Sequence, residues 1–276
     1  MRDRIGAVLQ LLFSRGPERE ISKHWLLRSS GSLDRKFRET GGYIFSERED
    51  FLQVEISDQI FLWPRNASKE MVLQLLSELL TPTHPHQYQY GETKIEPEDI
   101  VLDIGACEGA FTAFVSARCK KVIAVEPSKV MCKLMTKLFE IRNEPCPQIF
   151  NCLLGSQPGN AYFVDNLWNP GASMIASEST PGAYEIEVRT IDQIVETLPE
   201  KPTFLKCDAE GAEMQIFSGG KEFLRESHPK LAITTYHNVG DYREMYEFLK
   251  SLGYRVAGKG FLYTNRSLRP MMIHAW

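Results

Sequence analysis

Short apolar runs alternate with helical patterns from residue 100 onward. We interpret as buried strands the runs at residues 100–104, 122–125, 149–154, 203–207 and 231–236. Between them, apolar residues recur at helical spacing after Gly109 and after Ser128. This alternation predicts a doubly wound, mostly parallel α/β sheet of Rossmann-like type, which binds ligands beyond the carboxyl ends of its strands.

The remaining pattern predicts how this sheet is completed. A helix is expected over residues 241–252, with Asp241 as N-cap, Glu244 at the capping-box position and Gly253 after its end. Strands at 261–264 and 271–275 predict an antiparallel closing pair, and 184–188 a further short strand. We expect irregular structure over 155–182. The inner face of the helix after Ser128 is expected to carry Val130, Leu134, Leu138 and Ile141.

Residues 1–97 carry a different pattern, which predicts a small α+β appendage before a main domain at 98–276. Two strands are expected at 51–56 and 59–63, and residues 1–13 fit an amphipathic helix. Ser68 is the expected cap of a helix whose apolar face comprises Val72, Leu75, Leu76 and Leu79. Residues 83–90, with prolines nearby, are expected to be a linker. The appendage is expected to help form an acceptor site.

Composition narrows the class of protein. With 276 residues and a formal net charge of −4, the chain lacks the basic stripe that nucleic-acid binding requires, so no nucleic-acid partner is expected. Its six cysteines form no CxxC pair, which argues against zinc and favours reduced thiols in the cytoplasm. No apolar stretch reaches transmembrane length. The pattern leaves the oligomeric state open.

A glycine-containing loop follows the first strand of the main domain. The segment 101–109 reads VLDIGACEG, with Gly105 and Gly109 where a backbone can approach a ligand closely. A dinucleotide site would have a further glycine at Cys107 to seat a pyrophosphate. S-adenosylmethionine has no phosphate, so this looser loop fits it better, with Ala106 in the loop and Asp103 facing the ligand's ammonium group. A plain tight turn is the alternative.

Glu126 ends the second strand, 21 positions after Gly105, and is followed by Pro127. A carboxylate at this place can accept hydrogen bonds from both ribose hydroxyls of the cofactor. An exposed acid at a strand end is the alternative. Asn151 and Cys152, after the third strand, are predicted adenine contacts by position alone. Residues 165–174 are a candidate lid over the acceptor, or a packed surface loop.

These motifs resemble the FkbM-type methyltransferases. The resemblance covers about residues 90–276 and rests on Leu102–Ala106, on the segment LKCDAEGAE at 205–213 and on Tyr236-His237. Family members usually have Asn and an apolar residue where this chain has Cys107 and Glu108. The resemblance implies O-methylation of a hydroxyl on a sugar, polyketide or other secondary metabolite, with S-adenosylmethionine as methyl donor.

Candidate catalytic residues lie at two further strand ends. Asp208 is the leading candidate for orienting substrate or cofactor, accompanied by Lys206 and Glu210, and His237 is a candidate general base. The alternatives are acids that favour a helix start, a buried ion pair for Lys206 and a structural histidine. Asp208, Glu210 and His237 could also hold a divalent cation, although we expect a metal-free site.

Two other classes of function remain open from the sequence. A nicotinamide-dependent oxidoreductase would share the strand, the glycine loop and the acidic residue, but it would favour the missing third glycine. A catalytically silent cofactor-binding protein would have side chains filling the acceptor side.

Overall fold

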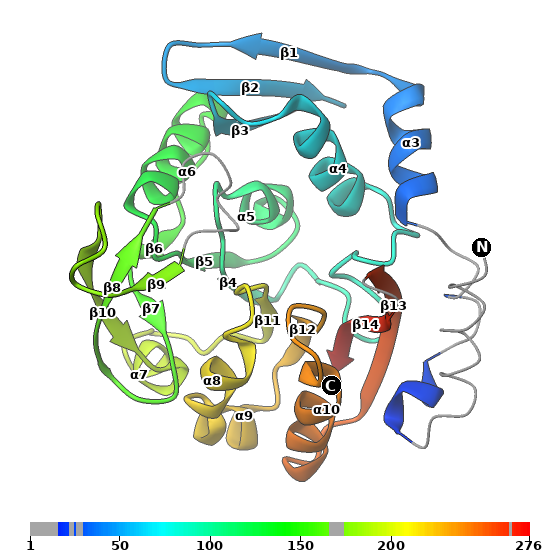
Figure 1. Ribbon diagram of the computed structural model, residues 1–276, viewed down its shortest axis with the longest axis vertical. Coiled ribbons are helices and arrows are strands. Elements are labelled where there is room, and N and C mark those ends of the chain that lie inside the picture. The colour runs from blue at the N-terminus through cyan, green and yellow to red at the C-terminus, as the bar shows by residue number, and fades with distance from the viewer. Residues whose placement is uncertain (1–15, 22–24, 26–29, 166–173, 265–266) are drawn as a thin grey trace.

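The computed structural model describes residues 16–21, 25, 30–165, 174–264 and 267–276. The helix expected over residues 1–13 lies outside these residues, as does most of the candidate lid at 165–174. Figure 1 shows the described elements wrapped around one large sheet.

The large sheet has seven strands in the order β13-β14-β12-β11-β4-β5-β6. All its neighbouring pairs from β12 through β6 are parallel, while β14 runs antiparallel to both β12 and β13. The expected parallel sheet with an antiparallel closing pair is therefore confirmed. Its strands are β4 (Ile100–Ile104), β5 (Lys121–Val125), β6 (Gln148–Phe150), β11 (Phe204–Cys207), β12 (Lys230–Thr234), β13 (Val256–Thr264) and β14 (Ser267–Ala275).

Helices cover both faces of this sheet, because side chains alternate along each strand. Leu102 and Ile104 face a core shared with α7 to α10, whereas Val101 faces a core shared with α4 and α5. The burial of both faces explains why β4 is apolar at four of its five positions. The helices are α5 (Ala110–Ser116), α6 (Lys129–Arg142), α7 (Ile191–Glu196), α8 (Glu213–Ser218), α9 (Lys221–Ser227) and α10 (Asp241–Ser251).

Local capping signals were read correctly in some helices and incorrectly in one. Ser128 caps α6 by accepting a hydrogen bond from the Met131 backbone N–H. In α10 the N-cap is Gly240, and Asp241 is the first helical residue, so the predicted Asp241 cap is wrong. Asp241 instead accepts a hydrogen bond from the Asn238 N–H at 2.7 Å, within the preceding turn.

The buried face of α6 also differs from the expectation. Leu134 and Leu138 are buried as predicted, but Val130 is 37% exposed and Ile141 is only partly buried. The flexible side chains of Met131 and Met135 occupy the core instead.

A second sheet interrupts the alternation of strands and helices between β6 and α7. Its order is β7-β10-β8-β9, and Figure 1 shows it beside the edge formed by β6. The run 149–154 is therefore split between two sheets, and the expected irregular stretch 155–182 contains two strands. The members are β7 (Leu153–Leu154), β8 (Gly159–Val164), β9 (Met174–Ala176) and β10 (Tyr184–Arg189).

Among the described residues, the N-terminal part contains a three-stranded antiparallel sheet and the helices α3 and α4, preceded by the short 3-10 helix η1 (Pro17–Glu20). Ser68 caps α4 as predicted, by accepting from the Met71 N–H. Trp63 and Leu76 share one core with Val101 and Phe204 of the large sheet, and the division at residue 97 stays a prediction. The elements are α3 (Ser30–Thr40), β1 (Tyr43–Glu47), β2 (Phe51–Ile56), β3 (Gln59–Pro64) and α4 (Lys69–Leu80).

The predicted linker at residues 83–90 is instead part of the interior. His84, His86, Gln87 and Tyr88 are all less than 9% exposed. The segment passes between α4 and the ends of β12 and β14, and the buried Lys259 ammonium donates a hydrogen bond to the Gln87 carbonyl. The prolines that suggested a linker therefore belong to a packed, irregular strap.

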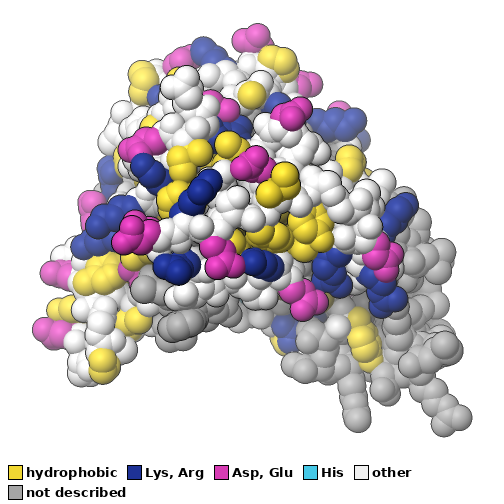
Figure 2. Space-filling model, turned by 90° about the horizontal axis from the view of Figure 1, so that it is seen from above, with side chains coloured by type: hydrophobic (Ala, Val, Ile, Leu, Met, Phe, Trp, Pro, Cys, Tyr) yellow, Lys and Arg dark blue, Asp and Glu magenta, His cyan; other side chains and the backbone are white. Residues whose placement is uncertain are grey.

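The surface seen in Figure 2 mixes basic and acidic side chains without a basic stripe on that face. The absence of a nucleic-acid partner stays a prediction. None of the helices in the described ranges has both the length and the apolarity needed to span a membrane.

Candidate active site

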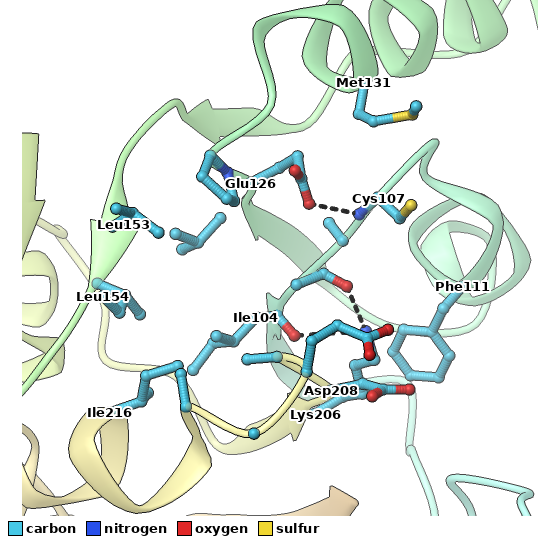
Figure 3. A pocket seen from close by; sticks show the side chains of 18 of the residues that line it. Ile104, Cys107, Phe111, Glu126, Met131, Leu153, Leu154, Lys206, Asp208 and Ile216 are labelled. Atoms are coloured by element: carbon cyan, nitrogen blue, oxygen red, sulfur yellow. Dashed lines mark hydrogen bonds between the residues drawn. The ribbon is translucent and has the colours of Figure 1, made fainter. Parts of the chain in front are cut away.

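A cavity of about 860 Å³ opens beyond the carboxyl ends of β4, β5 and β11. This volume lies within the usual range for small-molecule and cofactor sites. In Figure 3, Glu126 and Leu153 lie across the cavity from Asp208 and Phe111. One wall comes from the loops of the large sheet, and the other comes from α4, the strap at residues 83–90 and Tyr236.

The loop after β4 begins where the strand order reverses, since β4 lies between β5 and β11. Gly105 has a φ of +69°, and a Cβ there would lie 1.9 Å from the Asp208 carbonyl oxygen. Any side chain would thus separate the ends of β4 and β11. Gly109 has a φ of +87° and packs against Met135, and Cys107 also adopts a left-handed φ of +49°. Gly105, Ala106 and Cys107 line the cavity, and their contact with a cofactor stays a prediction.

Glu126 lies at the end of β5, as the sequence predicts, and joins the two cofactor-side loops. Its Oε2 accepts from the Cys107 N–H at 2.8 Å and its Oε1 from the Ser128 N–H at 2.8 Å. The side chain lines the cavity beside Pro127 and the residue is 6% exposed, so it is not an exposed acid. Burial raises the pKa of Glu126 to about 7.

Asp103 does not face the cavity, and its predicted contact with a ligand ammonium group is wrong. The residue is 0% exposed. Its carboxylate pairs with the Lys206 ammonium at 3.0 Å and accepts from the Thr112 hydroxyl at 2.5 Å. Asp103 and Lys206 are direct cross-strand partners of β4 and β11, which places their side chains on the same face of the sheet.

Lys206 therefore has its partner on β4 and not among the acids after β11. Its ammonium also donates to the Gly105 carbonyl at 2.6 Å, beneath the cofactor loop (Figure 3). Burial opposes the charge, but the Asp103 carboxylate outweighs it and raises the pKa of Lys206. Lys206 is thus a fixed cation that can position the loop and cannot act as a base at neutral pH.

Another carboxylate takes the place expected for Asp103. Glu108 lines the cavity and is 6% exposed, and burial raises its pKa. In the sequence, Glu108 was noted only as a residue that differs from the usual family pattern, and no role was predicted for it. Glu108 and Glu126 make the wall formed by the loops after β4, β5 and β6 acidic, which suits a cationic ligand. We call this wall the cofactor wall.

Asn151 and Cys152 follow β6, but only Cys152 lines the cavity. The Asn151 carboxamide donates to the Glu126 and Pro127 carbonyls at 2.9 and 2.8 Å. It therefore supports the turn that carries Glu126, so the predicted adenine contact is wrong for its side chain. Cys152, Leu153 and Leu154 form the cavity wall at this end.

Asp208, the leading candidate for orienting substrate or cofactor, lies where the loops of the large sheet meet the wall formed by α4 and the strap. Its Oδ2 accepts from the Tyr88 hydroxyl at 2.6 Å, and its Oδ1 from the Thr234 hydroxyl at 3.1 Å. Burial favours the neutral acid, but His86, Lys206 and His237 outweigh it and lower the pKa of Asp208. The group is therefore an ionised carboxylate with a side chain 18% exposed.

His237 lies behind Asp208 and is not among the residues that line the cavity. Its Nδ1 is 3.0 Å from Glu213, and its Nε2 is 3.5 Å from both Asp208 and Glu210. Burial opposes its charge, but the Glu213 hydrogen bond and the surrounding carboxylates raise the pKa of His237 to about 9. A protonated imidazole cannot accept a proton, so this geometry favours a positioning role over the predicted general base.

Glu210 and Glu213 differ in exposure. Glu210 lines the cavity with a left-handed φ of +53° and a half-exposed side chain, whereas Glu213 is buried at the start of α8. Glu213 also accepts from the Ala209 N–H at 2.9 Å, so it shapes the turn after β11. One ligand atom each from Asp208, Glu210 and His237 lies within 4.8 Å of the others, which would allow them to hold a divalent cation in place of the His237 proton.

Sequence reasoning missed the residues that the strap and α4 bring to the cavity. Glu78, His86 and Tyr88 all line it. His86 Nδ1 is 3.0 Å from the Glu78 carboxylate. The signal that could have found them is the cluster of polar aromatic side chains in HPHQYQY at 84–90, which is unusual for a solvated linker.

The large sheet, the loop after β4 and the cavity form a Rossmann-like methyltransferase fold. The chain matches the methyltransferase FkbM domain over residues 103–256, more than half of its length, and belongs to this family. The resemblance recognised in the sequence is thereby confirmed. A comparison with curated proteins gives no match.

Two solved structures are similar to this chain to different degrees. The methyltransferase FkbM from Methylobacillus flagellatus KT has a TM-score of 0.51 and 18% identity, over 77% of this chain and 56% of that protein. The chain thus spans little more than half of that protein. A putative methyltransferase from Streptococcus mutans, in complex with SAH, has a TM-score of 0.42 and 14% identity, over 66% of this chain and 89% of that one.

Proposed function

We propose that the protein transfers the methyl group of S-adenosylmethionine to a hydroxyl oxygen of a small molecule, among the sugars, polyketides and other secondary metabolites that the family resemblance implies. The observation that carries this proposal is the shared cavity, in which the cofactor loop and Glu126 face the ionised Asp208. When bound, the cofactor supplies an electrophilic methyl group on a positively charged sulfur.

The residues on the cofactor wall fit this group. Glu108 and Glu126 are buried carboxylates on a cavity wall, and the one lysine that lines the cavity, Lys206, is neutralised by Asp103. Glu126 can accept hydrogen bonds from ribose hydroxyls through the lone pairs that the backbone leaves free. Cys152 to Leu154 offer an apolar surface for the adenine ring.

Asp208 is the group that we assign as general base. An acceptor hydroxyl must lose its proton as the methyl group arrives, and a positioned base contributes about 10²–10⁴-fold to such a step. Asp208 is ionised, faces the cavity and is held by Tyr88 and Thr234. His237 then keeps the carboxylate ionised and oriented.

Calorimetric titration with S-adenosylmethionine and S-adenosylhomocysteine tests the cofactor assignment, with NADH as the control ligand. We expect heat from the first two and none from NADH. Binding of NADH alone would restore the oxidoreductase alternative. Mass spectrometry after incubation with methyl-labelled cofactor and hydroxylated metabolites then tests whether an oxygen receives the label; a catalytically silent protein would bind the cofactor without labelling any acceptor.

A further inference from the structure

His86 presents an unpartnered nitrogen to the cavity. Its side chain is 5% exposed, and Nε2 has no hydrogen-bond partner among the described residues. The other ring nitrogen, Nδ1, is 3.0 Å from the Glu78 carboxylate, which itself accepts from the Gln74 side chain. Glu78 therefore fixes the ring of a residue that lines the cavity and leaves Nε2 as its unused hydrogen-bonding atom.

One oxygen atom, placed to one side of the line that joins His86 and Asp208, could bridge the two residues. His86 Nε2 lies 3.9 Å from Asp208 Oδ2, which is too far for a direct hydrogen bond. An oxygen placed about 2.8 Å from each atom would bond to both. Tyr88 uses one lone pair of Oδ2, and the second remains free to accept from that oxygen.

The walls around this point are aromatic and aliphatic. Tyr88 and Phe111 meet edge to face with centroids 5.1 Å apart, and His86 meets Tyr236 in the same way at 5.4 Å. Rings in this arrangement offer faces and edges to a further flat ring. Aliphatic side chains and one indole complete this end of the cavity: Trp63, Met71, Leu75 and Leu79.

The polar groups next to His86 are largely engaged, although the Trp63 indole N–H at this end has no partner among the described residues. Glu78 is engaged by His86 and Gln74, and the Tyr88 hydroxyl already donates to Asp208. Each further hydroxyl buried without a partner would weaken binding by about fivefold or more. The largely aromatic and aliphatic wall at this end thus suits a flat molecule with few hydroxyls better than it suits a sugar with several.

We propose that the acceptor is a phenol, whose flat ring packs among Tyr88, Phe111 and Tyr236 and whose oxygen is held between His86 Nε2 and Asp208. This inference rests on the proposed methyl transfer and narrows its substrate class. Since the Nδ1–H donates to Glu78, Nε2 carries a hydrogen only in the protonated ring; burial opposes this charge, but Glu78 and Asp208 outweigh it and raise the pKa of His86. The protonated His86 donates its Nε2–H to the acceptor oxygen, and the acceptor O–H faces Asp208.

In the reaction the acceptor oxygen forms the new bond to the methyl carbon. The electron pair of the broken carbon–sulfur bond stays on sulfur, which loses its positive charge. The phenolic proton passes to the Asp208 carboxylate, which becomes a neutral acid. Phenols lose their proton near the pKa of tyrosine, about 10, so a carboxylate suffices as base more easily than it would for an aliphatic alcohol.

The substrate class is tested with 2-naphthol, its saturated counterpart decahydro-2-naphthol, and methyl glucoside, each with methyl-labelled cofactor. We expect the methyl ether of 2-naphthol to form at least tenfold faster than either other product. Faster methylation of methyl glucoside would overturn the proposal. So would the absence of naphthyl methyl ether from protein that binds S-adenosylhomocysteine, whereas failure to bind that ligand would overturn the proposed function itself.

The role of His86 is tested with His86→Phe, which keeps a flat ring but removes both nitrogens. We expect kcat/KM for 2-naphthol to fall about 10- to 100-fold, the scale of a lost hydrogen bond to a charged group, while S-adenosylhomocysteine affinity stays within about twofold. His86→Gln, whose amide can still donate, should lose less. Unchanged kcat/KM in His86→Phe would show that His86 does not hold the acceptor.

His84 provides the matched control. It is a buried histidine two residues earlier that pairs with Asp34 and does not line the cavity. His84→Asn keeps an acceptor for the backbone N–H of His86 and should lower stability without changing KM for 2-naphthol.

Glu78→Gln should retain more activity than Glu78→Leu, since only the amide can still bond to His86 Nδ1. Equal losses in both Glu78 variants, or a KM change in His84→Asn equal to that in His86→Phe, would refute the specific role of His86.

Discussion

The two walls of the cavity are built in different ways. The cofactor wall consists of short loops directly after β4, β5 and β6, so its residues lie close to one another in the sequence. The acceptor wall joins Tyr88 to Asp208 across 120 positions. The first wall depends on local backbone geometry, and the second on how the strap at 83–90 packs. Changes to the two walls should therefore have separable effects.

The largest effect is expected at Asp208, where the walls meet. Asp208→Asn keeps the size of the side chain but removes the base, so the single-turnover rate with 2-naphthol should fall by about 10²–10⁴. Affinity for S-adenosylhomocysteine should change far less. A similar loss in both quantities would mean that Asp208 belongs to the cofactor wall.

The next effect concerns the ion pair beneath both walls. Lys206→Met leaves the fully buried Asp103 without its cation and should lower the free energy of unfolding by about 3–5 kcal/mol. Urea denaturation measures this change. The double variant with Asp103→Leu should recover most of the loss, because no buried charge remains unpaired. A double variant as unstable as the single one would contradict this reading.

The contribution of His237 to the free energy of unfolding should depend on pH. Its raised pKa means that its stabilising charge is fully present below pH 6.5 and is lost as the pH rises through about 9. The contribution of His237 to the free energy of unfolding should fall over this window by up to about 3 kcal/mol, so the difference in stability between wild type and His237→Gln should shrink by that amount as the pH rises from 6.5 to about 9.

Two outcomes would reassign His237. If His237→Gln leaves the pH dependence of stability unchanged but lowers turnover by the factor expected for a base, the general-base prediction would be restored. If a chelator removes activity and a divalent cation restores it, then Asp208, Glu210 and His237 form a metal site.

The smallest effect should be confined to the cofactor wall. Glu126→Ala should weaken S-adenosylhomocysteine binding by about 1.5–3 kcal/mol, the scale of hydrogen bonds to a charged group. Because ribose hydroxyls donate best to an ionised carboxylate, wild-type affinity should rise as the pH passes about 7. Glu126→Gln should lose this dependence. Calorimetry at several pH values checks both, and a flat wild-type profile would exclude Glu126 from the contact.

Sequence patterns predicted the elements whose signals are local. The apolar run of β4, the Ser68 cap, the helix start near Ser128 and the position of Glu126 all follow from a few neighbouring residues. The second sheet was missed because its strands are short and separated by glycine, proline and polar residues. Asp241 was taken as a cap because Gly240, which has no side chain to signal its role, is the actual N-cap.

Side-chain roles were harder to predict than positions. Asp103 lies where the motif places it, but its carboxylate turns toward Lys206 because the two residues are paired across β4 and β11. Asn151 faces the turn after β5, and His237 faces three carboxylates. In each case residues distant in sequence decide which way the side chain faces, and for His237 they also decide its charge.

The sequence by itself determined the class of fold, the family and the loop that approaches the cofactor, because glycine spacing, strand periodicity and caps act within a few residues. Tertiary structure alone decided which carboxylates face the cavity and which group can accept a proton. It also decided that a segment resembling a linker supplies His86 and Tyr88. Burial and pairing set ionisation, and both depend on neighbours that only the folded chain brings together.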